Sequence, residues 1–299
     1  MDVVDQPIVD SSRAAPAVAD QSSTLSRTAP ASTRWWIELG AAAIVATVYL
    51  LSPRSVPSPS LIEQANVNSR RLFELERMLG VDIEHTVQRA IAAAHLTVIS
   101  NWSYGTLHFV VTAATLVYLY RVRPRDYVRW RTAFVVSCFL AFVCYRLWPV
   151  TPPRLLVGPD GRSLLVDTLA SDSAPWTFDS GAISQVANQY AAMPSMHAGW
   201  ALFCALALGL GRTPRVRLAL LGYPAAITVV IMASGNHYLL DAIGGFVAVG
   251  LGFAVCRIGV TVIRRTKGSS TWTTHTQLTA DRTTTSPSWH DGSRASSSR

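Results

Sequence analysis

Six runs of apolar residues, separated by short polar segments, dominate the pattern of the chain. They occupy residues 35–51, 102–120, 132–148, 195–211, 218–234 and 236–256, and their only acidic or basic members are Glu38, Arg146 and Asp241. Crossing the hydrocarbon core as a helix takes about 20 apolar residues, so each run fits one span if it extends by a turn into its flanks. The pattern therefore predicts an all-α fold, a polytopic membrane helix bundle with about six transmembrane helices.

The segment between the first two runs has a different pattern. Residues 61–100 mix charged side chains with apolar ones at helical spacing, as at Leu72, Leu75 and Leu79. This mixture is typical of helices that lie on or outside the membrane surface, and we predict two of them within an extramembrane segment at 52–101. It would separate a first transmembrane helix at 35–51 from a membrane domain at 102–266. Residues 1–34 and the Ser/Thr-rich residues 267–299 show no periodicity and are predicted to be disordered tails.

Composition and charge support the membrane assignment. Charged residues make up only 15% of the chain, and the net charge of +8 comes from basic residues grouped in the short segments between apolar runs. Such groups mark cytoplasmic loops and are too dispersed for a nucleic-acid surface. They follow the second, fourth and sixth runs, which predicts a multi-pass plasma-membrane protein with both termini cytoplasmic. The segment 150–194 and the turn at Gly235 would then be extracytoplasmic.

Three polar clusters fall on that outer face, although they lie far apart in the sequence. The first ends in Pro152-Pro153-Arg154, the second is Pro194-Ser195-Met196-His197, and the third is Asn236-His237-Tyr238 followed by Asp241. Because each cluster stands at one end of a predicted span, the topology alone brings all three to a similar membrane depth.

The residue types in these clusters suit phosphate chemistry. His237 and Asp241 are four residues apart, so on a helix the carboxylate can hydrogen-bond the imidazole and leave the other ring nitrogen basic. His197 falls in the first turn of a helix, where free N–H groups favour a phosphate, and Arg154 offers a planar fork for phosphate oxygens. A carboxylate within a span is costly without a partner, so we favour a functional role for Asp241.

Other residues in the spans have plainer explanations. For His108 we favour a structural hydrogen bond within the bundle. Gly244, Ala248 and Gly252 form a stripe of small residues that we assign to helix packing. Against a transporter, no other span carries an acid in the middle of the membrane, and no inverted repeat is visible.

The three clusters together resemble the signature of the type 2 phosphatidic acid phosphatase superfamily, in particular the branch that contains the fungal inositol phosphorylceramide synthases. The resemblance covers roughly residues 102–265. It implies phosphoryl transfer without a metal or another cofactor. His237 would attack phosphorus and form a phosphohistidine, with Asp241 orienting it, and His197 would protonate the leaving oxygen. The residues that would bind the phosphate are Arg154, Ser195, Asn236 and Arg146.

Arg146 belongs to this set because two basic positions of the broad superfamily pattern are missing. Leu147 stands where a lysine precedes Arg154 by seven residues, and Val230 and Ile231 stand where a Ser-Arg pair precedes His237. We predict that Arg146 replaces one of these lost ligands. Met196 also stands where glycine is commoner, and all these departures fit the synthase-like branch.

The predicted function is hydrolysis or transfer of a phosphoryl or phospho-headgroup on a lipid. The substrate would be a membrane phospholipid or an isoprenoid or other lipid phosphate, and the acceptor would be water or an alcohol. One alternative is an inositolphosphotransferase-like enzyme that moves a phospho-headgroup between lipids. A further alternative is a non-catalytic membrane protein that retains the fold. Nucleic acid is not expected as a partner.

Overall fold

The fold is built almost entirely from helices. The computed structural model describes residues 36, 38–40, 58–170 and 189–282. Two helices, α2 (Pro59–Leu79) and α3 (Glu84–Ala93), precede a continuous helical stretch made of α4 (Thr97–Trp102), the π-helical turn η1 (Ser103–Leu107) and α5 (His108–Val122). Next come α6 (Pro124–Leu147), α8 (Met196–Leu208), α9 (Pro214–Leu220), α10 (Gly222–Ala233) and α11 (Leu239–Arg282). Over the described residues β-structure is limited to two isolated bridges, so the all-α prediction is confirmed.

Local sequence signals set several helix ends. The Ser58 side chain accepts a hydrogen bond from the Leu61 N–H at the start of α2, and Pro59 occupies the first turn, where its missing N–H costs nothing. Gly80 ends α2 in the left-handed conformation at φ 67°, which glycine adopts without steric cost. α6 likewise begins at a proline, Pro124.

Four helical stretches are long and apolar enough to cross a membrane. They are Thr97–Val122, Pro124–Leu147, Pro214–Ala233 and Leu239–Gly259, and the apolar helix α8 is shorter. All five coincide with predicted runs, whereas the run at 35–51 lies largely outside the described residues. Large apolar side chains on these helices, such as Phe109, Phe139 and Val247, are more than half exposed. Exposed apolar side chains of this extent are expected on a surface that faces lipid and are unusual on a surface that faces water.

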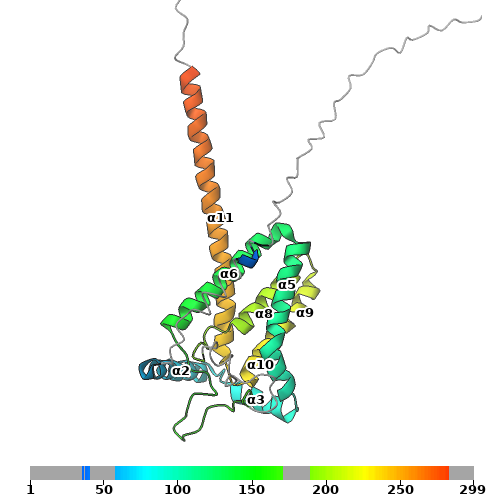
Figure 1. Cartoon of the computed structure of the whole chain (residues 1–299), viewed down its shortest axis with the longest axis vertical. Coiled ribbons are helices and arrows are strands. Elements are labelled where there is room, and N and C mark those ends of the chain that lie inside the picture. Colours follow the sequence, from blue (N-terminus) through cyan, green and yellow to red (C-terminus); the bar gives the residue numbers. More distant parts are fainter. Residues whose placement is uncertain (1–35, 37, 41–57, 171–188, 283–299) are drawn as a thin grey trace, which may run out of the picture.

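Helices are present between the first two runs as α2 and α3, and their place at the membrane surface stays a prediction. α2 lies across one end of the bundle, where α11 begins (Figure 1). Their buried faces are partly polar, with Asn68, Ser69 and Glu76 from α2 and Glu84 and Gln88 from α3. These helices therefore bind the bundle through hydrogen bonds as well as apolar packing.

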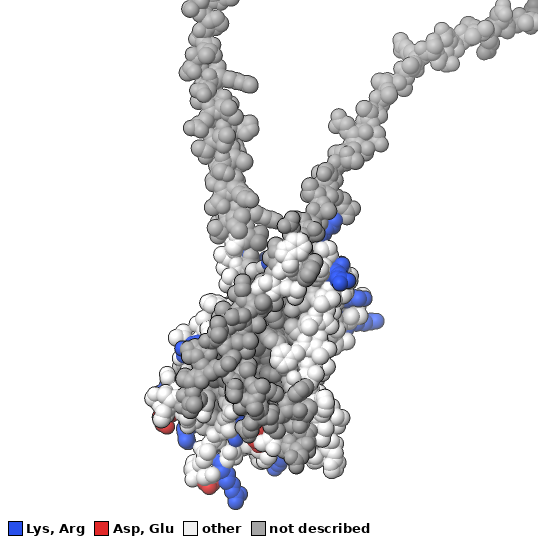
Figure 2. Space-filling view, in the orientation of Figure 1, with Lys and Arg blue, Asp and Glu red and all other residues white. Residues whose placement is uncertain are grey.

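Charged residues are distributed unevenly between the two ends of the bundle. Arginine or lysine side chains are in view both at the end where α5, α6 and α9 meet and at the opposite end near α2 and α3, whereas the acidic side chains in view lie only at the latter end (Figure 2). Arg123 from the α5–α6 junction donates to the Leu210 carbonyl after α8, which ties two arginine-bearing segments together. The orientation inferred from the loop arginines stays a prediction.

The last helix runs farther than the sequence pattern predicts. α11 continues to Arg282, so the first half of the predicted tail at 267–299 is helical. Adding a residue to an existing helix gains one hydrogen bond per residue and needs no new nucleation, so a polar segment can follow an apolar span as helix.

Small residues allow α11 to approach its neighbours closely. A Cβ atom on Gly245 would stand 2.1 Å from the Ser195 carbonyl oxygen, and one on Gly252 would stand 2.5 Å from the Ala133 oxygen of α6. A Cβ on Gly244 would meet the Pro194 side chain at 3.2 Å. Helix packing is thus the role of Gly244 and Gly252, as predicted, while the tightest position is Gly245.

We expect the Gly245→Ala variant to destabilise the bundle by about 1–3 kcal/mol or more, because its Cβ must displace the backbone of Ser195. Gly250→Ala is the matched control on the same helix, since an added Cβ there meets nothing within 4 Å. The Gly250→Ala variant should have a slightly higher free energy of unfolding, because alanine has a greater helix propensity than glycine. Thermal unfolding in detergent compares the two variants, and equal midpoints would contradict the close approach of α8 and α11.

Candidate active site

The three polar clusters meet through backbone hydrogen bonds. The Arg154 N–H donates to the Gly235 carbonyl at 2.9 Å, joining the first cluster to the third. The Ser195 N–H donates to the Asp241 carbonyl at 2.8 Å, joining the second to the third. Val150, just before the first cluster, donates to the Tyr190 carbonyl at 2.9 Å, just before the second. The fold therefore brings together the three polar clusters, which lie far apart in the sequence.

His237 and Asp241 form the predicted pair at the start of α11. The imidazole Nδ1 lies 3.3 Å from Asp241 Oδ2 and 2.9 Å from the Ala192 carbonyl oxygen. Both partners are acceptors, so Nδ1 carries the proton and Nε2 keeps its lone pair. Asp241 is fully buried and His237 is 5% exposed. The Ala192 carbonyl is a second anchor, which no motif predicts because Ala192 acts through its backbone.

His197 stands in the first turn of α8 beside His237. Their ring centroids are 5.6 Å apart. Tyr104 stacks on the His197 ring at 4.2 Å, and the His108 ring lies 4.0 Å from it on the α5 side. His108 is buried, and its Nδ1 has no hydrogen-bond partner among the described residues. The structural hydrogen bond predicted for His108 is therefore not seen at that nitrogen, and His108 instead lines the wall behind His197.

Tyr104 lies within the π-helical turn η1, and His108 follows that turn directly. A π turn inserts an extra residue into a helix and changes which side chains share a face, and such turns are common at functional sites. Tyr104 precedes His108 by four residues, and both contact the His197 ring.

Arg154 is held at both sides of its guanidinium. Its Nε donates to Asn236 Oδ1 at 2.8 Å, and its Nη1 donates to Asp167 Oδ2 at 2.7 Å. Arg154 is 5% exposed, so the group is fixed before any ligand arrives. Asn236 therefore positions the arginine through its side-chain oxygen, while its amide nitrogen binds Ser234. Asp167 was not among the predicted residues.

Ser195 is placed to meet a ligand. It is the residue before α8, it is fully buried, and its hydroxyl has no hydrogen-bond partner among the described residues. A buried hydroxyl without a partner is costly, and an incoming oxygen atom would remove that cost.

Arg146 does not join the other six predicted residues. It lies in the last turn of α6, its side chain is exposed, and it forms no hydrogen bond or ion pair within the part of the chain that the structure describes. Its role as a phosphate ligand stays a prediction. In the same described ranges no group of three or more His, Cys, Asp or Glu side chains is placed to hold a metal ion.

A family model described as the PAP2 superfamily matches residues 70–255. The chain belongs to the PAP2 superfamily. Phosphatase or phosphotransferase activity is therefore its general class of chemistry. Neither the comparison with curated proteins nor that with solved structures gives a match. The PAP2 match begins before the region of resemblance at 102–265, and so includes α3 and the second half of α2.

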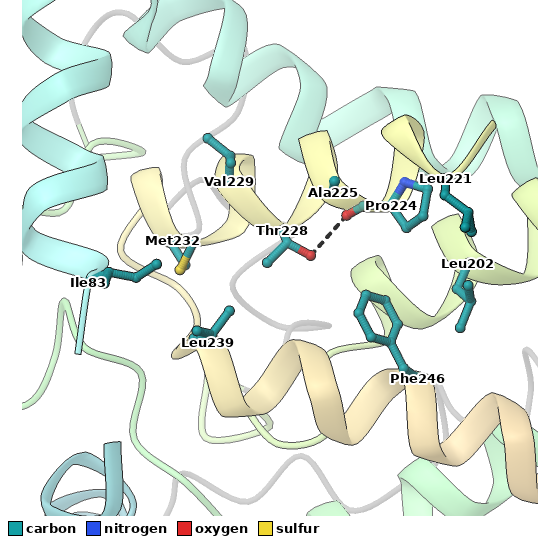
Figure 3. Close-up of a pocket in the computed structure, with 10 residues that line it drawn as sticks. All are labelled: Ile83, Leu202, Leu221, Pro224, Ala225, Thr228, Val229, Met232, Leu239 and Phe246. Carbon is teal, nitrogen blue, oxygen red and sulfur yellow. Dashed lines mark hydrogen bonds between the residues drawn. The ribbon is translucent and has the colours of Figure 1, made fainter. Parts of the chain in front are cut away.

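An apolar groove lies close to the third cluster of this PAP2 bundle. It has a volume of about 460 Å³ and lies between α10 and α11, with Ile83, the residue before α3, at one end (Figure 3). Met232 and Leu239 line the same end, on either side of the turn that carries His237. The Thr228 hydroxyl in its wall donates to the Pro224 carbonyl at 2.8 Å, so it offers its proton to no occupant.

We expect Arg154→Lys to weaken the binding of orthovanadate, a phosphate analogue, by roughly 10–100-fold. A lysine cannot keep both side-chain partners and still present a planar fork, and one charge-assisted hydrogen bond contributes about 1.5–3 kcal/mol. Titration calorimetry in detergent measures the affinity. Arg125→Lys, an exposed position at the opposite end of α6, is the control, and its affinity should equal that of the wild type. An equal loss in the control would contradict a phosphate site at Arg154.

Proposed function

We propose that this protein transfers a phosphoryl or phospho-headgroup from a lipid through a phosphohistidine on His237. The observation that carries the proposal is the double anchoring of Nδ1 by Asp241 and the Ala192 carbonyl, which leaves Nε2 as the nucleophile. A histidine with both ring nitrogens engaged in structural hydrogen bonds could not attack phosphorus.

The reaction has two steps in this proposal. The Nε2 lone pair forms a bond to phosphorus, the phosphorus–oxygen bond to the leaving group breaks, and the leaving oxygen takes a proton from His197. Water or an alcohol then attacks the phosphohistidine, His197 takes back a proton from the attacking oxygen, and the phosphorus–nitrogen bond breaks. Asp241 balances the positive charge on the phosphorylated imidazole.

Arg154 and Ser195 would stabilise the negative charge on the equatorial oxygens of the transition state. The fixed guanidinium needs little reorganisation as that charge develops, because Asn236 and Asp167 already hold it. The first turn of α8 has no side-chain cap, and its N–H groups would add a favourable dipole.

The proposed topology places this site on the extracytoplasmic face of the plasma membrane, with both termini in the cytoplasm. The loop arginines that follow the second, fourth and sixth apolar runs support that orientation by the positive-inside rule. The proposed lipid is a phospholipid or an isoprenoid phosphate, and its apolar chain would lie in the groove between α10 and α11.

A second candidate is transfer of a phospho-headgroup, such as phosphoinositol, between lipids. The observation that favours it is the ion pair of Arg154 with Asp167 at 2.7 Å, in a chain that lacks two basic residues of the superfamily pattern. A site with so little net positive charge favours the single negative charge of a phosphodiester over the two charges of a phosphomonoester.

The first test is inorganic phosphate release from a panel of lipid phosphates in detergent, with EDTA present. We expect metal-independent release by the wild type and none above background by His237→Ala. His197→Ala should slow the reaction by about 10²–10⁴-fold, the usual contribution of a general acid. A phosphoenzyme that is labile in acid and stable in base should form in the wild type and not in His237→Ala.

Equal rates for wild type and His237→Ala would overturn the phosphohistidine. If neither releases phosphate, the acceptor is not water, and the same proteins are assayed for headgroup exchange from a phosphodiester lipid to an alcohol. Exchange that depends on His237 would establish the second candidate, and its absence would leave the non-catalytic alternative.

The groove gives a separate prediction about the lipid chain. Ala225→Trp fills the groove, whereas Ala226→Trp places the same side chain on the next exposed position, which does not line it. We expect Ala225→Trp to raise the KM for long-chain substrates and to leave short-chain, water-soluble substrates unaffected. The control should match the wild type on both, and a chain-length dependence shared by both variants would place the lipid chain elsewhere.

A further inference from the structure

The first turn of α11 is held by three carboxyl groups. The N–H groups at the start of a helix have no partner inside the helix and must find one elsewhere. Here the Tyr238 N–H donates to Asp241 Oδ2 at 2.9 Å, the Leu239 N–H to Glu84 Oε1 at 2.8 Å, and the Leu240 N–H to Glu76 Oε1 at 2.8 Å. Two of the three acceptors thus come from the helices α2 and α3, more than 150 residues earlier in the chain.

The burial of these two glutamates costs free energy. Glu76 is fully buried and Glu84 is 3% exposed, and Glu76 Oε2 has no hydrogen-bond partner among the described residues. Burying a carboxyl group costs free energy that apolar residues of similar volume would not incur. Apolar packing alone could attach α2 and α3 to the bundle, but it would leave the Leu239 and Leu240 N–H groups without these acceptors.

The same two helices also hold the arginine side of the site. Ser69 of α2 donates to the Thr151 carbonyl at 2.9 Å, three residues before Arg154. Gln88 of α3 donates to the Val166 carbonyl at 2.9 Å, next to Asp167, and also to the Ala233 carbonyl at 3.1 Å. α2 and α3 therefore contact both the segment that carries Arg154 and the turn that leads to His237.

We propose that Glu76 and Glu84 are positioning residues, which dock α2 and α3 onto the first turn of α11 and fix the His237–Asp241 pair relative to Arg154. The proposal rests on the proposed role of His237 as nucleophile. A small displacement of a nucleophile from its in-line position is costly, since an error of about 1 Å can reduce a rate about 100-fold.

The surroundings of Glu76 and Glu84 set the protonation state of the two carboxyl groups. Burial raises the pKa of Glu76, the Leu240 hydrogen bond lowers it, and the neighbouring carboxyl groups of Glu84 and Asp241 raise it, so that the pKa lies at about 9. Burial also raises the pKa of Glu84. The remaining titratable group that faces the two glutamates is the Tyr238 phenol. At neutral pH Glu76 is therefore protonated, and its carbonyl oxygen can still accept the Leu240 N–H.

The sign of the pH dependence follows from proton binding. Between pH 4.5 and about 9 the folded form keeps a proton on Glu76 that the unfolded chain has lost. Docking of α2 on α11 is therefore strongest below pH 4.5 and weakens as the pH rises through this interval. Glutamine has the shape of a protonated glutamate and cannot ionise, so Glu76→Gln should remove this weakening.

The test compares three substitutions on α2. Glu76→Leu removes the acceptor of the Leu240 N–H, Glu76→Gln keeps it, and Glu74→Gln changes an exposed glutamate on the same helix as a control. We expect Glu76→Leu to lower kcat about 10–100-fold with little change in KM. We expect Glu76→Gln to retain most of the neutral-pH rate and to lose the alkaline decline of the wild type, and Glu74→Gln to behave as wild type.

Hydrogen exchange of the Leu239 and Leu240 amides provides a readout that does not require catalysis. Exchange should be faster in Glu76→Leu than in Glu76→Gln, even if no substrate is turned over and the proposed function fails. A Glu76→Leu protein that unfolds at a lower temperature but keeps its kcat would reduce the glutamates to a structural role. Unchanged exchange in Glu76→Leu would overturn the proposal outright.

Discussion

The backbone N–H groups at the start of α11 are the constraint on which the candidate site depends. In the low-dielectric interior of a membrane protein these groups cannot be left without acceptors. The chain supplies carboxyl groups, one from α11 itself and two from helices that come much earlier in sequence. Satisfying the helix end thus also fixes where His237 points, which helices cover it, and how Arg154 is brought near.

The close approach of α8 to α11 completes this arrangement. Gly245 lets the Ser195 carbonyl come against α11, and the Ser195 N–H binds the Asp241 carbonyl. The two histidines therefore belong to helices whose backbones touch. Their separation is set by main-chain contact, which is stiffer than side-chain packing.

The sequence predicts the parts of this site that depend on local periodicity. The apolar runs give the helices, and the spacing of His237 and Asp241 gives their hydrogen bond because both lie within one helical turn. Ser195 and Arg154 follow from motifs whose positions at span ends bring them together. The family model matching residues 70–255 confirms the superfamily, whereas the synthase-like branch stays a prediction.

The residues that the sequence does not predict have partners far away in the chain. Asp167 lies in a segment without periodic pattern, so nothing in the sequence connects it with Arg154. Glu76 and Glu84 stand on helices rich in charge, where an acid is ordinarily expected to face water. Tyr104 and His108 are four residues apart on one helical face, but their contact with His197 depends on how this stretch packs against α8.

The shortness of α8 has a consequence for how a lipid reaches the site. Thirteen helical residues rise about 20 Å, while the hydrocarbon core is about 30 Å thick. If Arg212, just after α8, lies at the level of one headgroup layer, His197 at the other end of α8 lies beneath the opposite layer. The phosphate of a lipid substrate would then have to move deeper into the bilayer than the neighbouring headgroups, or the bilayer would have to thin around α8. The energetic barrier to turnover would in that case include deforming the membrane, and the rate would depend on bilayer thickness.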